Sequence, residues 1–139
     1  MTNGEGTARE ILLAEDNPAD VYLVREALRE HGVDHELHVA QDGEEALTYV
    51  ARMGKAGETL CPDLLLLDLN LPKCDGPTVL KALRTHPEGA EIPVIVITSS
   101  DAAKDQARVA NLGINRLFRK PSNYQDFMQL GSIIRNIVS

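Results

Sequence analysis

Residues 64–72 read LLLLDLNLP: four consecutive leucines, an aspartate at position 68, and a proline that closes the segment. A solid apolar run of this length is typical of a strand that is buried on both faces, as in the interior of a parallel sheet. Similar runs occur at residues 11–14 (ILLA) and 94–97 (VIVI). The three runs predict the central strands of a parallel β-sheet.

Two less apolar segments, 36–40 and 114–119, have the mixed composition that suits the edges of such a sheet. Segments with apolar residues at helical spacing separate the strands. The first is capped by Asn17 and ended by Gly32, and the others are 44–53, 78–86, 101–112 and 123–138. Strand and helix alternate five times, and crossovers between parallel strands are right-handed. The chain is therefore predicted to be an α/β protein with helices on both faces of a doubly wound sheet.

The chain has 139 residues, the size of one domain, and we expect a flexible tail over residues 1–9 and a single domain over 10–139. The net charge of −7 argues against nucleic acid as a partner, and the absence of a long apolar run argues against a membrane. The polar N-terminus and the presence of only two cysteines predict a cytoplasmic protein.

Polar residues follow four of the five predicted strands. Glu15 and Asp16 follow the first, Asp68 the third, Thr98 the fourth and Lys120 the fifth. In open α/β sheets, ligands bind outside the carboxyl ends of the strands, so these side chains are expected to meet in one cleft.

The chemistry of such a cleft follows from its charges. Three carboxylates at close range repel one another and require a cation. Oxygen ligands without histidine or cysteine favour Mg²⁺ or Mn²⁺. A divalent cation, a lysine and a hydroxyl around Asp68 describe a phosphoryl-binding site with its own nucleophile.

The motifs EDNP (15–18), LDLNLP (67–72), ITS (97–99) and KP (120–121) stand in this order at the predicted strand ends. Together they resemble the receiver domain of two-component response regulators. The motif LDLNLP is most similar to that of the single-domain regulators associated with phytochromes. The resemblance covers about residues 9–138. It implies the flavodoxin-like (βα)5 fold with strand order 2-1-3-4-5.

The resemblance also implies a role for each site residue. Asp68 is the phosphoacceptor, and the Thr98 hydroxyl and Lys120 bond the phosphoryl group. The cation ligands implied are Glu15, Asp16, Asp68 and the backbone carbonyl of Asn70. A cis peptide bond is expected before Pro121, since proline lowers the cost of the cis form to about 0.5–1 kcal/mol.

By the same resemblance, the protein is a phosphorelay module rather than an enzyme, one that catalyses only its own phosphorylation and slow dephosphorylation. The donor is a sensor histidine kinase, with the phytochrome type as a candidate. The module is expected to have no output domain and to signal to an unidentified protein target through a changed binding surface. The last helix is also a candidate protein-binding or homodimer face, because Tyr124, Met128 and Ile133 lie outside its apolar stripe.

One position departs from the common receiver pattern. Many receivers have an aromatic residue three positions before the lysine, where this chain has Leu117, and Phe118 is predicted to face the opposite side of its strand. An aromatic switch is therefore in doubt. In the fourth helix, Ala103, Ala107 and Ala110 are predicted to form a weakly anchored inward face.

Two other classes of α/β protein are alternatives to a receiver. A phosphatase of the haloacid dehalogenase type needs a second aspartate two residues after the nucleophile, where this chain has Asn70. A flavin-binding electron carrier needs a phosphate-binding loop after the first strand, where Glu15 and Asp16 would repel a phosphate. Both classes fit less well than a receiver.

Overall fold

The computed structural model describes residues 8–55, 59–99 and 102–139. Within these ranges five strands form a single sheet in the order β2-β1-β3-β4-β5, and every pair of neighbours is parallel. The strands are β1 (Arg9–Ala14), β2 (His35–Ala40), β3 (Leu64–Asp68), β4 (Val94–Thr98) and β5 (Arg116–Arg119). The predicted topology is confirmed.

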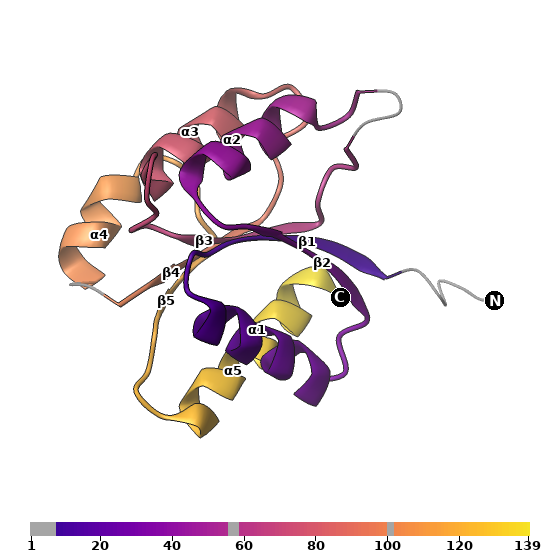
Figure 1. Ribbon diagram of the computed structural model, residues 1–139, viewed down its shortest axis with the longest axis vertical. Helices are drawn as coiled ribbons and strands as arrows, with labels where there is room; N and C mark the ends of the chain where they lie inside the picture. The colour runs from indigo at the N-terminus through magenta and orange to yellow at the C-terminus, as the bar shows by residue number, and fades with distance from the viewer. Residues whose placement is uncertain (1–7, 56–58, 100–101) are drawn as a thin grey trace.

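Helices cover both faces of this sheet (Figure 1). They are α1 (Pro18–Glu30), α2 (Gly43–Arg52), α3 (Gly76–Thr85), α4 (Ala102–Val109) and α5 (Tyr124–Val138). α1 and α5 pack on one face, and α2 and α3 lie on the other, with α4 beside them (Figure 1). This arrangement confirms the flavodoxin-like doubly wound fold.

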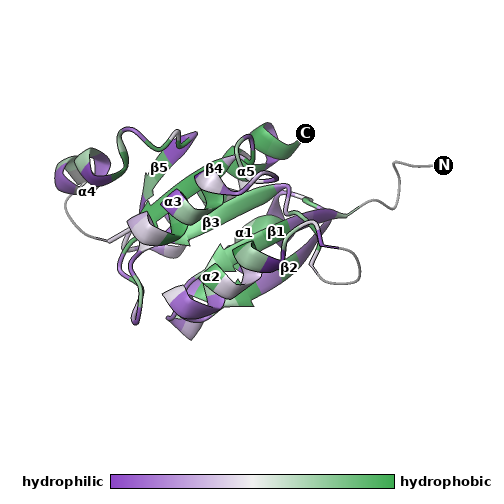
Figure 2. Cartoon of the chain, turned by 90° about the horizontal axis from the view of Figure 1, so that it is seen from above, coloured by the Kyte–Doolittle hydropathy of each residue, from purple (hydrophilic) through white to green (hydrophobic). Residues whose placement is uncertain are grey.

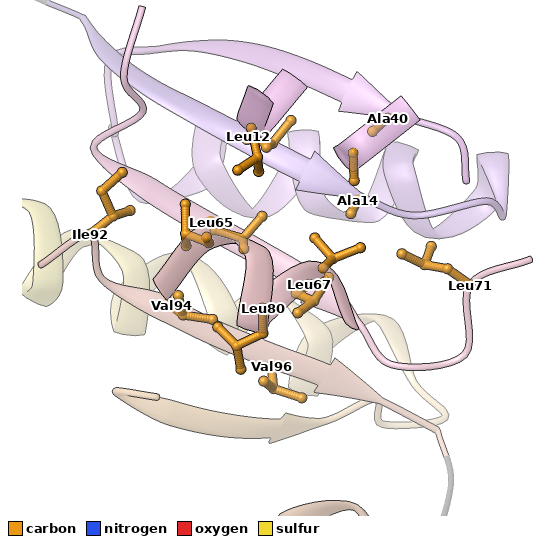
Figure 3. Packing of buried hydrophobic residues seen from close by; sticks show 14 of the residues in the cluster. Leu12, Ala14, Ala40, Leu65, Leu67, Leu71, Leu80, Ile92, Val94 and Val96 are labelled. Atoms are coloured by element: carbon orange, nitrogen blue, oxygen red, sulfur yellow. The ribbon is translucent and has the colours of Figure 1, made fainter. Parts of the chain in front are cut away.

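The apolar run of β3 places the strand in the middle of the sheet because its side chains are buried on both faces. Leu65 and Leu67 pack toward α2 and α3, whereas Leu64 and Leu66 pack toward α1 and α5. Leu80 of α3 lies over β3 and β4 (Figure 3). Figure 2 shows the same central strands as hydrophobic along their length. Burial of this kind contributes about 25 cal/mol for each Å² removed from water.

Capping side chains fix where four of the helices begin. In each case the side chain of the residue before the helix accepts a hydrogen bond from a backbone N–H in the first turn. The four capping residues are Asn17, Asp42, Asp75 and Asn123. These residues come shortly after β1, β2, β3 and β5. The chain therefore turns from strand to helix at the carboxyl edge of the sheet, where the candidate site lies.

The fourth helix differs from its prediction. It ends at Val109, three residues earlier than expected, and residue 101 lies outside the described residues. Ala103, Ala107 and Ala110 are exposed, so the predicted inward face is wrong. Val109 is buried instead. Burying a valine removes more apolar surface from water than burying an alanine does. This difference accounts for the helix facing the core with its Val109 side.

The last helix also corrects an expectation. Met128 is buried and Ile133 packs against the α1–α5 side of the core, so these two residues do not form a free face. Tyr124 is exposed. A homodimer therefore stays a prediction with less support than the sequence suggested.

At the N-terminus, β1 begins at Arg9, one residue before the predicted start of the domain. Residues 1–7 of the expected tail lie outside the described residues. No helix in the described part of the chain combines the length and the apolar character needed to span a bilayer.

Candidate functional site

The carboxyl ends of β1 and β3 bring three acidic side chains together. One carboxylate oxygen from each of Glu15, Asp16 and Asp68 lies within 4.8 Å of the other two. Glu15 and Asp68 are buried, and Asp16 is exposed. Three hard oxygen donors, one of them open to solvent, fit a divalent cation such as Mg²⁺ or Mn²⁺ that keeps part of its water shell.

Asp68 ends β3 and is only 5% exposed. Its Oδ1 accepts a hydrogen bond from the backbone N–H of Asn70 at 2.9 Å, and its Oδ2 lies 3.0 Å from Lys120 Nζ. The loop behind it is tightly packed, because a Cβ at Gly76 would lie 2.8 Å from the Asp68 carbonyl oxygen. The carboxylate is therefore held in a fixed orientation by both neighbours.

Lys120 is the cation of the cleft, and its side chain is 12% exposed. Its Nζ lies 3.0 Å from Glu15 Oε1, 3.0 Å from Asp68 Oδ2 and 2.8 Å from Asp20 Oδ2. Burial alone would lower the pKa of Lys120, but hydrogen bonds to Asp20 and Glu15 outweigh it and hold that pKa above its ordinary value. The lysine is thus charged at neutral pH.

The position of Asp20 was missed by sequence reasoning. Asp20 lies in the first turn of α1, where an acidic residue is ordinarily explained by the positive end of the helix dipole. One feature of the sequence could have indicated its position. Asp20 follows Asp16 by only four residues, so it has to lie near the same edge of the sheet.

Glu15 has a raised pKa. Burial raises the pKa of Glu15 to about 7, and the neighbouring charge of Asp68 adds to the rise, while hydrogen bonding to Lys120 opposes it. Lys120 offsets part of the cost of burying this carboxylate, and a further cation beside Glu15 would stabilise its charged form more strongly. The arrangement therefore favours binding of a cation over an empty acidic cluster.

Thr98 and Asn70 complete the set predicted from the sequence. Thr98 is buried at the end of β4, next to Ile97, which pairs with Asp68 across the sheet. Its carbonyl accepts a hydrogen bond from the Lys120 backbone N–H at 2.8 Å. The structure thus brings all six predicted residues to one edge of the sheet, and their individual roles stay predictions.

Two details of the fifth strand bear on the resemblance. No peptide bond among the described residues is cis, so the bond before Pro121 is trans and the cis expectation is wrong. Trans is the lower-energy form even before proline, by about 0.5–1 kcal/mol. Leu117 packs on the α2–α3 side of the sheet, and Phe118 packs edge-on against Phe127 on the other side. Phe118 therefore does not occupy the position of the usual aromatic residue.

Comparison with known proteins agrees with this geometry. The family model for the response regulator receiver domain matches residues 11–131. Response regulator Rcp1 of Synechocystis sp. is 36% identical over 130 residues, which cover 94% of this chain and 88% of that protein. Receiver domains of response regulators accept phosphoryl groups from sensor histidine kinases.

Solved structures show the same relationship. The phosphorylated cyanobacterial phytochrome response regulator RcpA matches with a TM-score of 0.82 and 37% identity, covering 93% of this chain and 92% of its own. The Mn²⁺-bound form of Rcp1 matches with a TM-score of 0.81 and 37% identity, covering 92% of each chain. The fold, the acidic cluster and these similarities together show that the chain belongs to the response regulator receiver domain family.

Proposed function

We propose that this protein accepts a phosphoryl group on Asp68 from a sensor histidine kinase, in a reaction that requires Mg²⁺ or Mn²⁺ bound by Glu15, Asp16, Asp68 and the backbone carbonyl of Asn70. One observation carries the proposal: the Asp68 carboxylate is one of the three that can hold a cation together, and its Oδ2 lies 3.0 Å from the Lys120 ammonium. Transfer of a charged phosphoryl group requires a positioned nucleophile with positive charge beside it, which the Lys120 ammonium and a cation held by these carboxylates would supply.

The chemistry follows from phosphoryl transfer as a reaction. A carboxylate oxygen of Asp68 attacks phosphorus as the bond from phosphorus to the donor breaks, and the donor leaves with that electron pair. Lys120 and the Thr98 hydroxyl donate hydrogen bonds to the phosphoryl oxygens. The divalent cation, when bound, neutralises charge on the phosphoryl group. The buried setting of Asp68 and Thr98 limits the access of water to the acyl phosphate.

Two relatives support the proposal through the states in which their structures were solved, one phosphorylated and the other bound to Mn²⁺. Both belong to response regulators with a similarity to this chain over nearly its whole length. A kinase of the phytochrome type is accordingly the proposed donor. The signal would pass to a protein target through a change of binding surface, without catalysis of other reactions. The expected cytoplasmic location stays a prediction.

Intact-protein mass spectrometry tests the proposal with acetyl phosphate as the phosphoryl donor. With Mg²⁺ present, wild type should gain the mass of one phosphoryl group, and Asp68→Asn should gain none. Chelation of the metal should abolish the gain in wild type. The matched control is Asp63→Asn, which makes the same substitution at an exposed position just before β3 and should be modified like wild type.

Other outcomes of this mass-spectrometry experiment would contradict the proposal or change its interpretation. Modification that persists in Asp68→Asn would assign the phosphoryl group to another residue. Modification that is equally fast after chelation would remove the metal from the mechanism. Loss of modification in both Asp68→Asn and Asp63→Asn would point to a general defect of β3 instead of a missing nucleophile.

A further inference from the structure

Asp20 makes the shortest of the three contacts to Lys120, at 2.8 Å compared with 3.0 Å to Glu15 and to Asp68. The Asp20 side chain is 18% exposed, so this ion pair is largely shielded from water. Nothing in the proposed phosphoryl-transfer chemistry uses Asp20. Its carboxylate is also outside the group of three that fits a metal ion.

A lysine ammonium has three N–H donors, and three carboxylates surround Lys120. Two of them, Glu15 and Asp68, are also the side chains expected to bind the divalent cation. A cation bound there takes up their charge and repels the ammonium. Asp20 is the one of the three carboxylates that cation binding leaves available to the lysine.

We propose, on the basis of the function proposed above, that Asp20 is a positioning residue that keeps Lys120 in the cleft when the divalent cation occupies Glu15 and Asp68. A lysine that is 12% exposed is costly to leave without a partner. With Asp20 present, the ammonium keeps one strong contact and its remaining N–H donors are free for the phosphoryl oxygens. Without Asp20, the ammonium either remains on the metal ligands or leaves the cleft.

Metal binding by calorimetry is the first test, because it does not depend on phosphorylation. Asp20→Asn keeps the shape of the side chain and removes its charge, and it should weaken Mg²⁺ binding about threefold to tenfold, since Lys120 then competes for the metal ligands. Asp20→Glu should bind Mg²⁺ nearly as wild type does. Asp34→Asn removes the same charge from an exposed position before β2 and should leave the affinity unchanged.

The second test is the rate of phosphorylation by acetyl phosphate at saturating Mg²⁺, where a weaker metal affinity no longer matters. Asp20→Asn should lower the maximal rate about tenfold, the scale of one charge-assisted hydrogen bond. Asp20→Glu should restore most of it, and Asp34→Asn should match wild type. Recovery in Asp20→Glu separates positioning of Lys120 from a general loss of structure.

The two proposals fail in different ways. If wild type is phosphorylated and Asp20→Asn equals it in both affinity and maximal rate, Asp20 has no positioning role and the proposed function stands. The same conclusion follows if Asp20→Glu is as defective as Asp20→Asn. If wild type itself is not modified, the proposed function fails, and this inference fails with it.

Discussion

Asp68 has two hydrogen-bond donors within 3.0 Å, a backbone N–H and the Lys120 ammonium, and it lies beside two further carboxylates. None of these neighbours is close to it in sequence except Asn70. The reactivity proposed for this aspartate therefore comes from its surroundings, which orient one oxygen and offset its charge. The same surroundings raise the pKa of Glu15 to about 7, chiefly through burial and also through the neighbouring charge of Asp68.

A second aspartate, Asp75, has a lowered pKa and gives a prediction on pH. Hydrogen bonds from the hydroxyl and backbone N–H of Thr78, with Arg108 nearby, hold the pKa of Asp75 below its ordinary value of 3.8. A lowered pKa in the folded state stabilises the protein above that ordinary value. This contribution is lost as the pH falls through the pKa of the folded state.

Asp75→Asn can still cap α3 but cannot ionise. Wild type should therefore exceed Asp75→Asn in free energy of unfolding at neutral pH, and the difference should shrink as the pH falls below about 4. Urea titrations of both proteins at several pH values measure it. A difference that stays constant down to the lowest pH at which both fold would show that the charge of Asp75 does not contribute.

Among the described helices, α1 and α5 make the most extensive helix–helix contact, and Gly131 allows it. A Cβ at this position would lie 2.1 Å from the Ala27 carbonyl oxygen and 2.5 Å from Cδ2 of His31. Both contacts are far below the separation that real Cβ atoms adopt. The distance between the two helices is therefore set by the absence of a side chain on α5.

Gly131→Ala should lower the free energy of unfolding by about 1–3 kcal/mol through overpacking. Helix propensity alone predicts the opposite sign, because alanine is a better helix former than glycine by about 1 kcal/mol. A loss of stability would therefore identify the packing as the cause. Ser132→Ala, at the neighbouring exposed position of α5, is the matched control and should change stability by less than about 0.5 kcal/mol. Chemical denaturation measures both variants, and a Gly131→Ala protein as stable as wild type would refute the packing argument.

For the whole molecule, the sequence predicts the sheet and its strand ends well. A strand that is buried on both faces requires a continuous apolar run, and such runs are easy to recognise in the sequence. The run of leucines at residues 64–67 has few structural interpretations, and parallel topology then brings Asp68 close to Glu15 and Lys120. The site was predictable because the fold alone places these strand ends at one edge.

What the sequence did not reveal depends on contacts between side chains. Asp20 has an ordinary explanation at a helix start, and only the structure shows it against Lys120. The rotation of α4 was predicted from alanine spacing, although the buried residue is Val109. Met128 lies outside the apolar stripe that residue spacing gives for α5, yet the α1–α5 side of the core buries it. Such details depend on the packing between elements, which periodicity within one element does not report.

The central claim is that Asp68 carries the phosphoryl group. Borohydride reduces an acyl phosphate to the alcohol, so a phosphorylated aspartate becomes homoserine. The most direct measurement is to treat the protein with acetyl phosphate and Mg²⁺, reduce it with borohydride, and map the modified residue by tandem mass spectrometry. We predict homoserine at position 68 and at no other aspartate. Homoserine at Asp16, Asp20 or Asp75 in place of Asp68 would contradict the account.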